Sequence, residues 1–218
     1  MHPFSLIPAS DGSGCSVIVE VVGKWSKGLM KAAASDKPRY IWVDGPYGQL
    51  TLPLIHQMKR VVLVAGGVGI TPIIGILQDL LTNAVVNQKI TLIWSFRNVE
   101  LFHELEAELA DFERQGAEKI TLELFQTGQG EDLQILSQEM SDPGSSTTGS
   151  RTLHHGRAEF GPIFRSIAGT IKKERTSLVG EEVGVFVCGS RSLRNGVLRA
   201  ARPTAFCRFV VHSESFSP

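Results

Sequence analysis

The stretch from Val61 to Pro72 reads VVLVAGGVGITP and decides the fold class. Its first residues are apolar and mostly β-branched, so they predict a buried strand over Val61–Ala65. Apolar residues at helical spacing then predict a helix over Pro72–Leu81. Three glycines lie within four positions at the start of the turn between them. Such a turn lets backbone N–H groups approach a pyrophosphate, whose charge the helix N-terminus favours.

The spacing of this turn excludes two common nucleotide motifs. No Lys-Ser or Lys-Thr pair follows the glycines, so the turn is not a P-loop. Pro72 stands where an ordinary dinucleotide motif has its third glycine, and proline suits a first helical turn. Thr71 can donate its hydroxyl to a phosphate or cap the helix. The alternative is a tight turn without a ligand.

Strands and helices alternate after this turn. Apolar runs predict strands over Ile90–Phe96, Ile120–Phe125 and Val183–Cys188, and helical periodicity predicts helices over Glu100–Gln115 and Phe164–Lys173. Strands separated by helices indicate an α/β fold with a Rossmann-like parallel sheet, which binds ligands beyond the carboxyl ends of its strands.

The chain before residue 59 has another pattern. Short apolar runs broken by Gly, Pro, Asp and Ser predict an all-β region. We therefore expect two domains, 1–58 and 59–218. The polar segment 128–156 is expected to be a flexible surface loop, or a regulatory phosphorylation loop. His154 and His155 within it are expected to be exposed to solvent and not to bind metal.

Composition sets further limits. The 218 residues carry 22 Lys plus Arg and 22 Asp plus Glu, which gives no electrostatic reason to expect nucleic acid as a partner. Three cysteines without CxxC spacing argue against a disulfide framework or a metal site and fit a reducing compartment. Neither a signal peptide nor a run of ~18 apolar residues is visible, so we expect this chain alone to be soluble.

Five blocks in order resemble the ferredoxin-NADP reductase superfamily. Within it, they are similar to the cytosolic dehydrogenase region of membrane ferric-chelate reductases and NADPH oxidases. The blocks are HPFS (2–5), DGPYG (44–48), AGGVGITP (65–72), VFVCGS (185–190) and RFVVHSESF (208–216). The resemblance implies that the all-β region is part of an antiparallel FAD-binding β-barrel and that the second domain binds NADPH.

The resemblance implies a flavin site in the first domain. The HPFS strand, with His2, Pro3, Phe4 and Ser5, would lie against the flavin; Phe4 would cover the isoalloxazine and Ser5 would sit near N5. The alternative for Phe4 is an ordinary core position of a strand.

Two further segments would contact FAD. Trp25 and Ser26 would lie near its pyrophosphate, with Lys24 or Lys27 as a basic neighbour, unless these lysines belong to a solvated hairpin. The turn after Asp44 would lie at the adenine end, or would simply join the domains. Its candidate residues are Pro46, Tyr47 and Gly48.

The nucleotide half supplies the remaining candidates. The glycine turn, with Gly66, Gly67 and Gly69, would hold the pyrophosphate. The second strand ends in SFRN, which places Ser95 and Arg97 at its end, where an Arg suits the 2′-phosphate of NADP. Surface salt bridges are the alternative role for Arg97.

The resemblance adds three elements further along the chain. Arg157 would supply a second guanidinium to the 2′-phosphate, unless it too forms a surface salt bridge. Cys188 and Gly189 would lie beside the nicotinamide, followed by Ser190 where the family usually has Pro; a small buried hydrophobe is the alternative for Cys188. Phe216 would cover the flavin face and move for hydride transfer.

The resulting hypothesis is an NADPH-dependent flavin oxidoreductase. Electrons would pass from NADPH to FAD and on to haem in a membrane domain outside this chain, with a ferric chelate as final acceptor. About half of the β-barrel is expected to be missing, which suggests a fragment of a protein located at the cytoplasmic face of a membrane. The alternatives are an NADPH oxidase dehydrogenase domain with oxygen as acceptor, a soluble flavoprotein reductase, and a non-catalytic nucleotide-binding or interaction domain.

Overall fold

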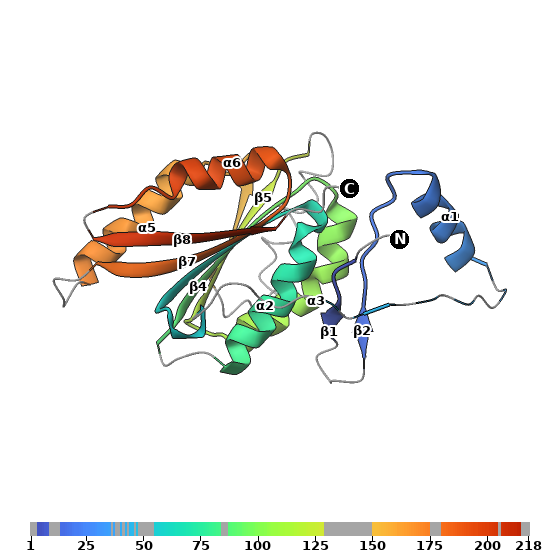
Figure 1. Cartoon of the computed structure of the whole chain (residues 1–218), viewed down its shortest axis with the longest axis horizontal. Coiled ribbons are helices and arrows are strands. Elements are labelled where there is room, and N and C mark those ends of the chain that lie inside the picture. Colours follow the sequence, from blue (N-terminus) through green and yellow to red (C-terminus); the bar gives the residue numbers. More distant parts are fainter. Residues whose placement is uncertain are drawn as a thin grey trace, which may run out of the picture.

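A six-stranded parallel sheet forms the body of the molecule (Figure 1). The computed structural model describes residues 4–8, 14–35, 37, 40, 42, 44–45, 47, 55–83, 87–128, 150–174, 180–204 and 206–214. The strands of the sheet are β3 (Arg60–Gly66), β4 (Lys89–Phe96), β5 (Ile120–Gln126), β6 (Ser150–His155), β7 (Glu181–Cys188) and β8 (Cys207–Glu214). All neighbouring pairs are parallel, in the order β6-β5-β4-β3-β7-β8. The predicted α/β class with a parallel sheet is confirmed.

Helices cover both faces of the sheet. The helices α2 (Ile70–Asn83) and α3 (Val99–Gln115) pack on one face, and α5 (Phe160–Glu174) and α6 (Arg191–Ala200) pack on the other (Figure 1). The central strand β3 reads as a continuous apolar run after Arg60, because its successive side chains enter opposite cores. Leu63 joins the core under α2 and α3, whereas Val62 and Val64 join the core under α5.

The strand order reverses direction at β3. The chain proceeds from β3 through β4 and β5 to β6 on one side, and then crosses to β7 on the other side. In open α/β sheets the ligand crevice lies beyond the carboxyl ends of the strands at such a switch point. Here that point lies between β3, which ends at Gly66, and β7, which ends at Cys188.

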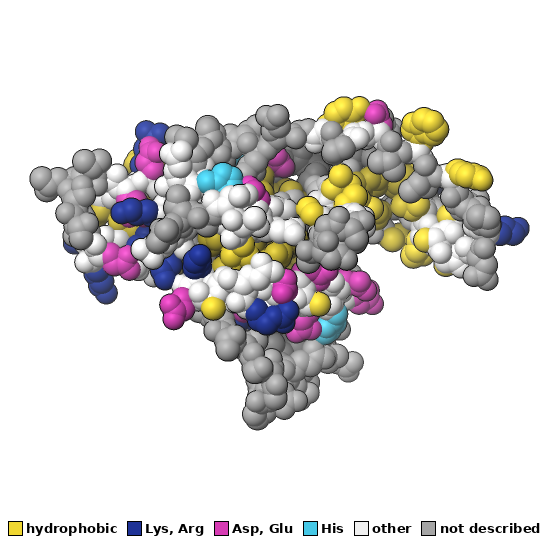
Figure 2. Space-filling view, turned by 90° about the horizontal axis from the view of Figure 1, so that it is seen from below, with side chains coloured by type: hydrophobic (Ala, Val, Ile, Leu, Met, Phe, Trp, Pro, Cys, Tyr) yellow, Lys and Arg dark blue, Asp and Glu magenta, His cyan; other side chains and the backbone are white. Residues whose placement is uncertain are grey.

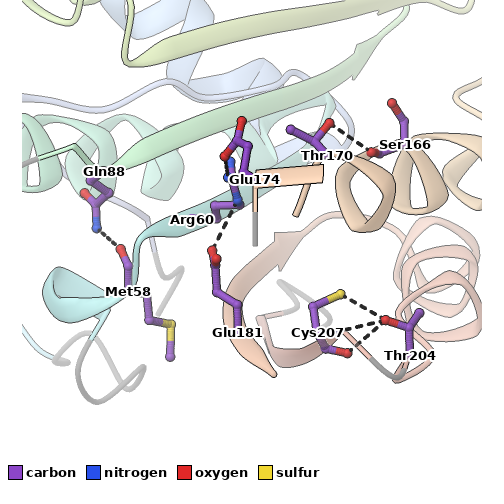
Figure 3. A network of polar contacts seen from close by, with 9 residues as sticks. All are labelled: Met58, Arg60, Gln88, Ser166, Thr170, Glu174, Glu181, Thr204 and Cys207. Atoms are coloured by element: carbon purple, nitrogen blue, oxygen red, sulfur yellow. Dashed lines mark hydrogen bonds and ion pairs between the residues drawn. The ribbon is translucent and has the colours of Figure 1, made fainter. Parts of the chain in front are cut away.

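A polar network fixes the opposite, amino-terminal edge of the sheet (Figure 3). Arg60 at the start of β3 pairs with Glu174 at the end of α5 and, through Nε, with Oε1 of Glu181 on β7 at 3.2 Å. The fully buried Gln88 donates through Nε2 to the carbonyl oxygen of Met58 at 2.8 Å. These contacts join the starts of β3 and β7 to the end of α5, and the segment before β4 to the segment before β3, away from the switch point.

The strand β6 is a correction to the predicted loop over 128–156, of which 129–149 lie outside the described residues. It pairs with β5 through all six of its residues. Its Arg151 forms a bidentate ion pair with Glu113 of α3, at 3.2 Å and 2.6 Å, and both side chains are buried. His154, expected to be exposed, is half-buried: it pairs with Glu123 and stacks on Phe125 with ring centroids 4.4 Å apart. His155 is exposed, as predicted.

The chain before β3 forms smaller elements. They are the antiparallel pair β1 (Ile7–Pro8) and β2 (Cys15–Ser16), the helix α1 (Lys24–Ala33) and the short 3₁₀ helix η1 (Ile55–Gln57). The antiparallel sheet agrees with the prediction, and it has two strands in the part of the chain that is described.

The helix α1 corrects the expectation of an all-β region. The Ser26 Oγ accepts hydrogen bonds from the backbone N–H groups of Val22 and Gly23, both at 3.0 Å, which satisfies donors at the helix start. Lys24 and Lys27 therefore lie on a helix and not on a hairpin. The side chains of Trp25 and Met30 are exposed, and Figure 2 shows hydrophobic side chains gathered at the surface of this part of the molecule.

Candidate nucleotide-binding site

The glycine turn leads directly from β3 into α2. Gly66 ends the strand, residues Gly67–Gly69 form the 3₁₀ turn η2, and α2 begins at Ile70. Gly67 has a φ of +53°, a conformation that favours glycine, and a Cβ placed there would have open space around it. The turn therefore offers an open backbone surface at the N-terminal end of a helix, as an anionic ligand requires.

The turn packs against the end of β7. A Cβ on Gly69 would lie 2.6 Å from the carbonyl oxygen of Cys188, and one on Gly189 would lie 3.2 Å from the Cα of Gly66. Gly189 also has a φ of +153°. The contact at Gly69 leaves no room for a side chain, and the positive φ of Gly189 favours glycine at that position. The structure thus brings Gly66, Gly69, Cys188 and Gly189 together at the switch point.

Cys188 is a buried, neutral thiol. Burial raises its pKa to about 12, with a further contribution from the nearby charge of Glu214. Its Sγ would lie 3.3 Å from a Cβ on Gly69, so the side chain faces the glycine turn. Because a thiolate is the reactive form of cysteine, this thiol is suited to shaping the site and not to nucleophilic attack.

A helix begins directly after each of the two turns: α2 after the glycine turn and α6 after the Cys188–Gly189 turn. Thr71 is the second residue of α2, and its hydroxyl donates to the carbonyl oxygen of Val68 at 3.0 Å. Pro72 lies in the first turn of α2, as predicted. Ser190 precedes α6, and its Oγ accepts from the backbone N–H of Leu193 at 3.4 Å. Ser190 therefore supplies a cap for this helix.

Ser95 and Arg97 lie at the end of β4. Ser95 pairs in register with Gly66, so it sits beside the glycine turn. Arg97 is exposed, and a Cβ on Gly128, after β5, would lie 3.2 Å from its carbonyl oxygen. The loop after β4 thus lies against the loop after β5. The Arg97 side chain at this edge of the sheet has solvent access.

Arg157 lies farther along the same edge, after β6. It is exposed and lines a hollow of about 690 Å³ on the α5 face of the sheet, with Glu123, His154 and Phe125 among the other lining residues. The strand β5 separates β6 from β4. Arg157 and Arg97 therefore follow different strands of the sheet, and the glycine turn does not line this hollow.

The described flavin candidates lie in the N-terminal part. Phe4 and Trp25 stack with ring centroids 5.7 Å apart and an interplanar angle of 27°, and both remain exposed. Ser5 is half-buried, and Ser26 is engaged at the start of α1. The Tyr47 hydroxyl donates to Asp44 at 2.6 Å. This hydrogen bond raises the pKa of Tyr47, and desolvation makes a smaller contribution in the same direction. Five further candidates fall outside the described residues: His2, Pro3, Pro46, Gly48 and Phe216.

One contact to the turn was missed at the sequence level. The indole Nε1 of Trp94, on β4, donates to the carbonyl oxygen of Gly67 at 3.1 Å. Its position in an apolar strand predicts a core aromatic, and the partner lies 27 residues away. The only available signal was that the strand over Ile90–Phe96 follows the strand–turn–helix unit in a predicted parallel sheet.

Membrane spans and metal clusters are both absent from the described ranges. Of the helices in these ranges, none is long and apolar enough to cross a bilayer. The same ranges contain no cluster of three or more His, Cys, Asp or Glu residues suited to a metal ion.

The switch-point glycine turn and the adjoining Cys-Gly turn on a parallel sheet define a Rossmann-like dinucleotide-binding domain. Residues 58–201 match the family described as Ferric reductase NAD binding domain, and the chain belongs to this family. The expected placement in the ferredoxin-NADP reductase superfamily, beside ferric reductases and NADPH oxidases, is confirmed.

The curated relatives include an NADPH oxidase, dual oxidases and a ferric reduction oxidase. The chain is 27% identical to a superoxide-generating NADPH oxidase heavy chain of Dictyostelium discoideum over 99% of its length, and 27% identical to human dual oxidase 2 over 92%. It is 39% identical to the mitochondrial ferric reduction oxidase 3 of Arabidopsis thaliana over 44% of its length. It spans 34%, 14% and 15% of these relatives, respectively.

Solved structures share the fold. The cytochrome b5 reductase domain of Ulva prolifera nitrate reductase matches 95% of this chain and 78% of its own, with a TM-score of 0.57 and 14% identity. The ferredoxin-NADP+ reductase from Plasmodium falciparum matches 96% of this chain and 76% of its own, with a TM-score of 0.52 and 17% identity.

Proposed function

We propose that the chain is the NADPH-binding part, with a portion of the FAD-binding part, of an NADPH-dependent flavin oxidoreductase. The observation that carries this proposal is the backbone contact between the glycine turn and the Cys188–Gly189 turn at the switch point. One turn suits the pyrophosphate of a dinucleotide, and the other turn lies where its nicotinamide end would reach.

The residues present fit NADPH. The open space at Gly67 lets a pyrophosphate approach the backbone, and the start of α2 favours its charge. Ser95 lies beside the turn, and Arg97 is an exposed cation directly after the end of β4, the neighbouring strand. Arg97, with Arg157 as a second guanidinium, supports NADPH over NADH because an arginine matches the 2′-phosphate.

The chain's own task is orientation. NADPH, when bound, supplies a hydride, and FAD, when bound, accepts it and passes electrons on singly. The turn at Gly67–Gly69 packs directly against the turn at Cys188–Gly189, so neither can shift alone. Together with the buried thiol of Cys188, they would hold the nicotinamide in one plane. The step requires no acid–base side chain, which agrees with a Cys188 thiol that stays protonated.

The N-terminal part fits one side of a flavin site. Phe4 and Trp25 present stacked, exposed rings, and a flavin ring would cover such a surface. Ser5 would approach the flavin, while the start of α1 at Ser26 would face its pyrophosphate. A flavohemoglobin from Malassezia yamatoensis with bound FAD, whose structure matches 95% of this chain with a TM-score of 0.53, supports this assignment at the level of the fold.

The final acceptor would be reached through haem in a membrane domain, at the cytoplasmic face of a membrane. The family match and the Arabidopsis relative favour a ferric chelate. Oxygen is the second candidate, because the relatives that match along nearly the whole chain are a superoxide-generating NADPH oxidase and dual oxidases.

An assay of the full-length protein in membranes tests this proposal. NADPH-dependent reduction of a ferric chelate that persists without oxygen is the expected result. Superoxide formation with little chelate reduction would favour the second candidate. NADPH consumption with neither product, or no consumption, would contradict the proposed function.

A further inference from the structure

The carbonyl group of Gly67 is held from the protein side by two donors. The indole N–H of Trp94 donates to it at 3.1 Å, and so does the backbone N–H of Ile70 at the start of α2. Trp94 pairs in register with Ala65, one residue before the glycines begin. Its side chain is fully buried, so the core of the sheet reaches the turn directly.

An aromatic cluster fixes the indole. The ring of Trp94 lies 4.6 Å from that of Phe96 and 6.3 Å from that of Phe102, and these two phenylalanines stack at 5.5 Å. All three side chains are almost completely buried. Close packing of this kind leaves the indole one orientation, so its N–H is a fixed donor.

The fixed donor matters because of the backbone that it meets. Gly67 has a positive φ and no side chain, so its flanking peptide groups can rotate easily. A carbonyl oxygen rotated outward would repel a phosphate. An oxygen bonded to Trp94 and Ile70 stays turned toward the protein.

We infer that Trp94 is a positioning residue for the turn that receives the pyrophosphate of NADPH. This inference rests on the proposed function. The indole does not touch the nucleotide; it fixes the peptide group whose orientation decides whether the turn attracts or repels the anion.

Two variants separate positioning from simple loss of packing. Trp94→Phe keeps an aromatic ring but removes the N–H. Phe164→Leu removes a buried ring from the core on the α5 face of the sheet and leaves the Trp94 cluster and its hydrogen bond in place. Calorimetric titration of the folded chain would measure binding of NADPH, and of adenosine 2′-monophosphate, which has no pyrophosphate.

The two variants should differ in a specific way. Trp94→Phe should weaken NADPH binding by about five- to tenfold, the effect of one lost hydrogen bond, and should leave adenosine 2′-monophosphate within about twofold. Phe164→Leu should lower the melting temperature while NADPH affinity stays within about twofold. Unchanged NADPH affinity in Trp94→Phe, or equal weakening in both variants, would overturn the inference alone. A wild-type chain that does not bind NADPH would overturn the proposed function as well.

Discussion

A Cβ added to Gly69 would lie 2.6 Å from the carbonyl oxygen of Cys188. The glycine turn after β3 and the end of β7 are therefore in direct backbone contact, although they are more than a hundred residues apart in the sequence. This contact makes the two turns one structural unit. A substitution that moves the backbone of one turn should therefore also displace the other turn.

Replacing Gly69 by alanine tests this unit. The added methyl group cannot be accommodated without moving the backbone of β7 or of the turn, so Gly69→Ala should weaken NADPH binding by about tenfold or more and lower the melting temperature. Gly75→Ala is the matched control, because its Cβ would lie 3.9 Å from Pro8 in ordinary contact within α2. It should raise stability by about 0.5–1 kcal/mol. Normal NADPH affinity in Gly69→Ala would contradict the tight contact.

The cysteines should differ in reactivity. Cys15 is exposed, whereas Cys188 and Cys207 are buried. A thiol reagent such as DTNB should label Cys15 quickly in the folded chain and reach the other two only after denaturation. Peptide mass spectrometry assigns the labelled positions. Labelling of Cys188 as fast as Cys15 would show that its thiol is open to solvent.

The thiol of Cys188 should also make stability depend on alkaline pH. Its pKa is raised from 9.0 to about 12 in the folded chain, mainly by burial. The unfolded chain therefore releases this proton first as pH rises, and the stabilisation present below pH 9 is lost progressively up to about pH 12. In urea unfolding, the stability advantage of wild type over Cys188→Ala should shrink across this range. A constant difference would argue against the raised pKa.

The buried ion pair between Glu113 and Arg151 should be important for the edge of the sheet. Glu113→Ala leaves the guanidinium of Arg151 buried without its bidentate partner, which should cost about 3–5 kcal/mol of unfolding free energy. Glu106 is a suitable control because it lies 3.8 Å from the same arginine but is about half exposed. Glu106→Ala should cost less than about 1 kcal/mol. Equal effects in chemical denaturation would mean that burial of the pair is not decisive.

Arg97 should decide the choice between the two nicotinamide cofactors. Arg97→Ala removes a guanidinium from the expected 2′-phosphate site, so the preference for NADPH over NADH should fall about tenfold while NADH affinity is unchanged. Arg157→Ala should act in the same direction. Arg114→Ala, on an exposed position of α3 paired with Asp111, should leave the ratio unaltered. The ratio of dissociation constants is the measurement, and an unchanged ratio in Arg97→Ala would exclude its role.

The sheet could be predicted because its strands are encoded locally. Residues 61–65, 90–96 and 183–188 are mostly apolar runs, and the structure extends each by only one or two residues. The glycine turn and Cys188 were predicted in the same way, since glycine spacing is a local signal. Their mutual contact was implied only by the parallel order of the strands.

The missed elements depend on partners distant in sequence. The strand β6 reads SRTLHH, and it is held by Arg151 contacting Glu113 on α3 and by His154 stacking on Phe125. A polar composition gives no sign of such pairings. Trp94 was missed for the same reason, because its donor role exists only once β3 and β4 lie side by side. Tertiary contacts override local propensity in each case.

Electron transfer from NADPH to the flavin is tested most directly by anaerobic mixing of the FAD-loaded full-length protein with NADPH while the visible absorption of the flavin is followed. We expect rapid loss of the oxidised flavin band with NADPH and a much slower loss with NADH. A protein that retains FAD and binds NADPH, yet keeps an unchanged flavin spectrum, would contradict the proposed function.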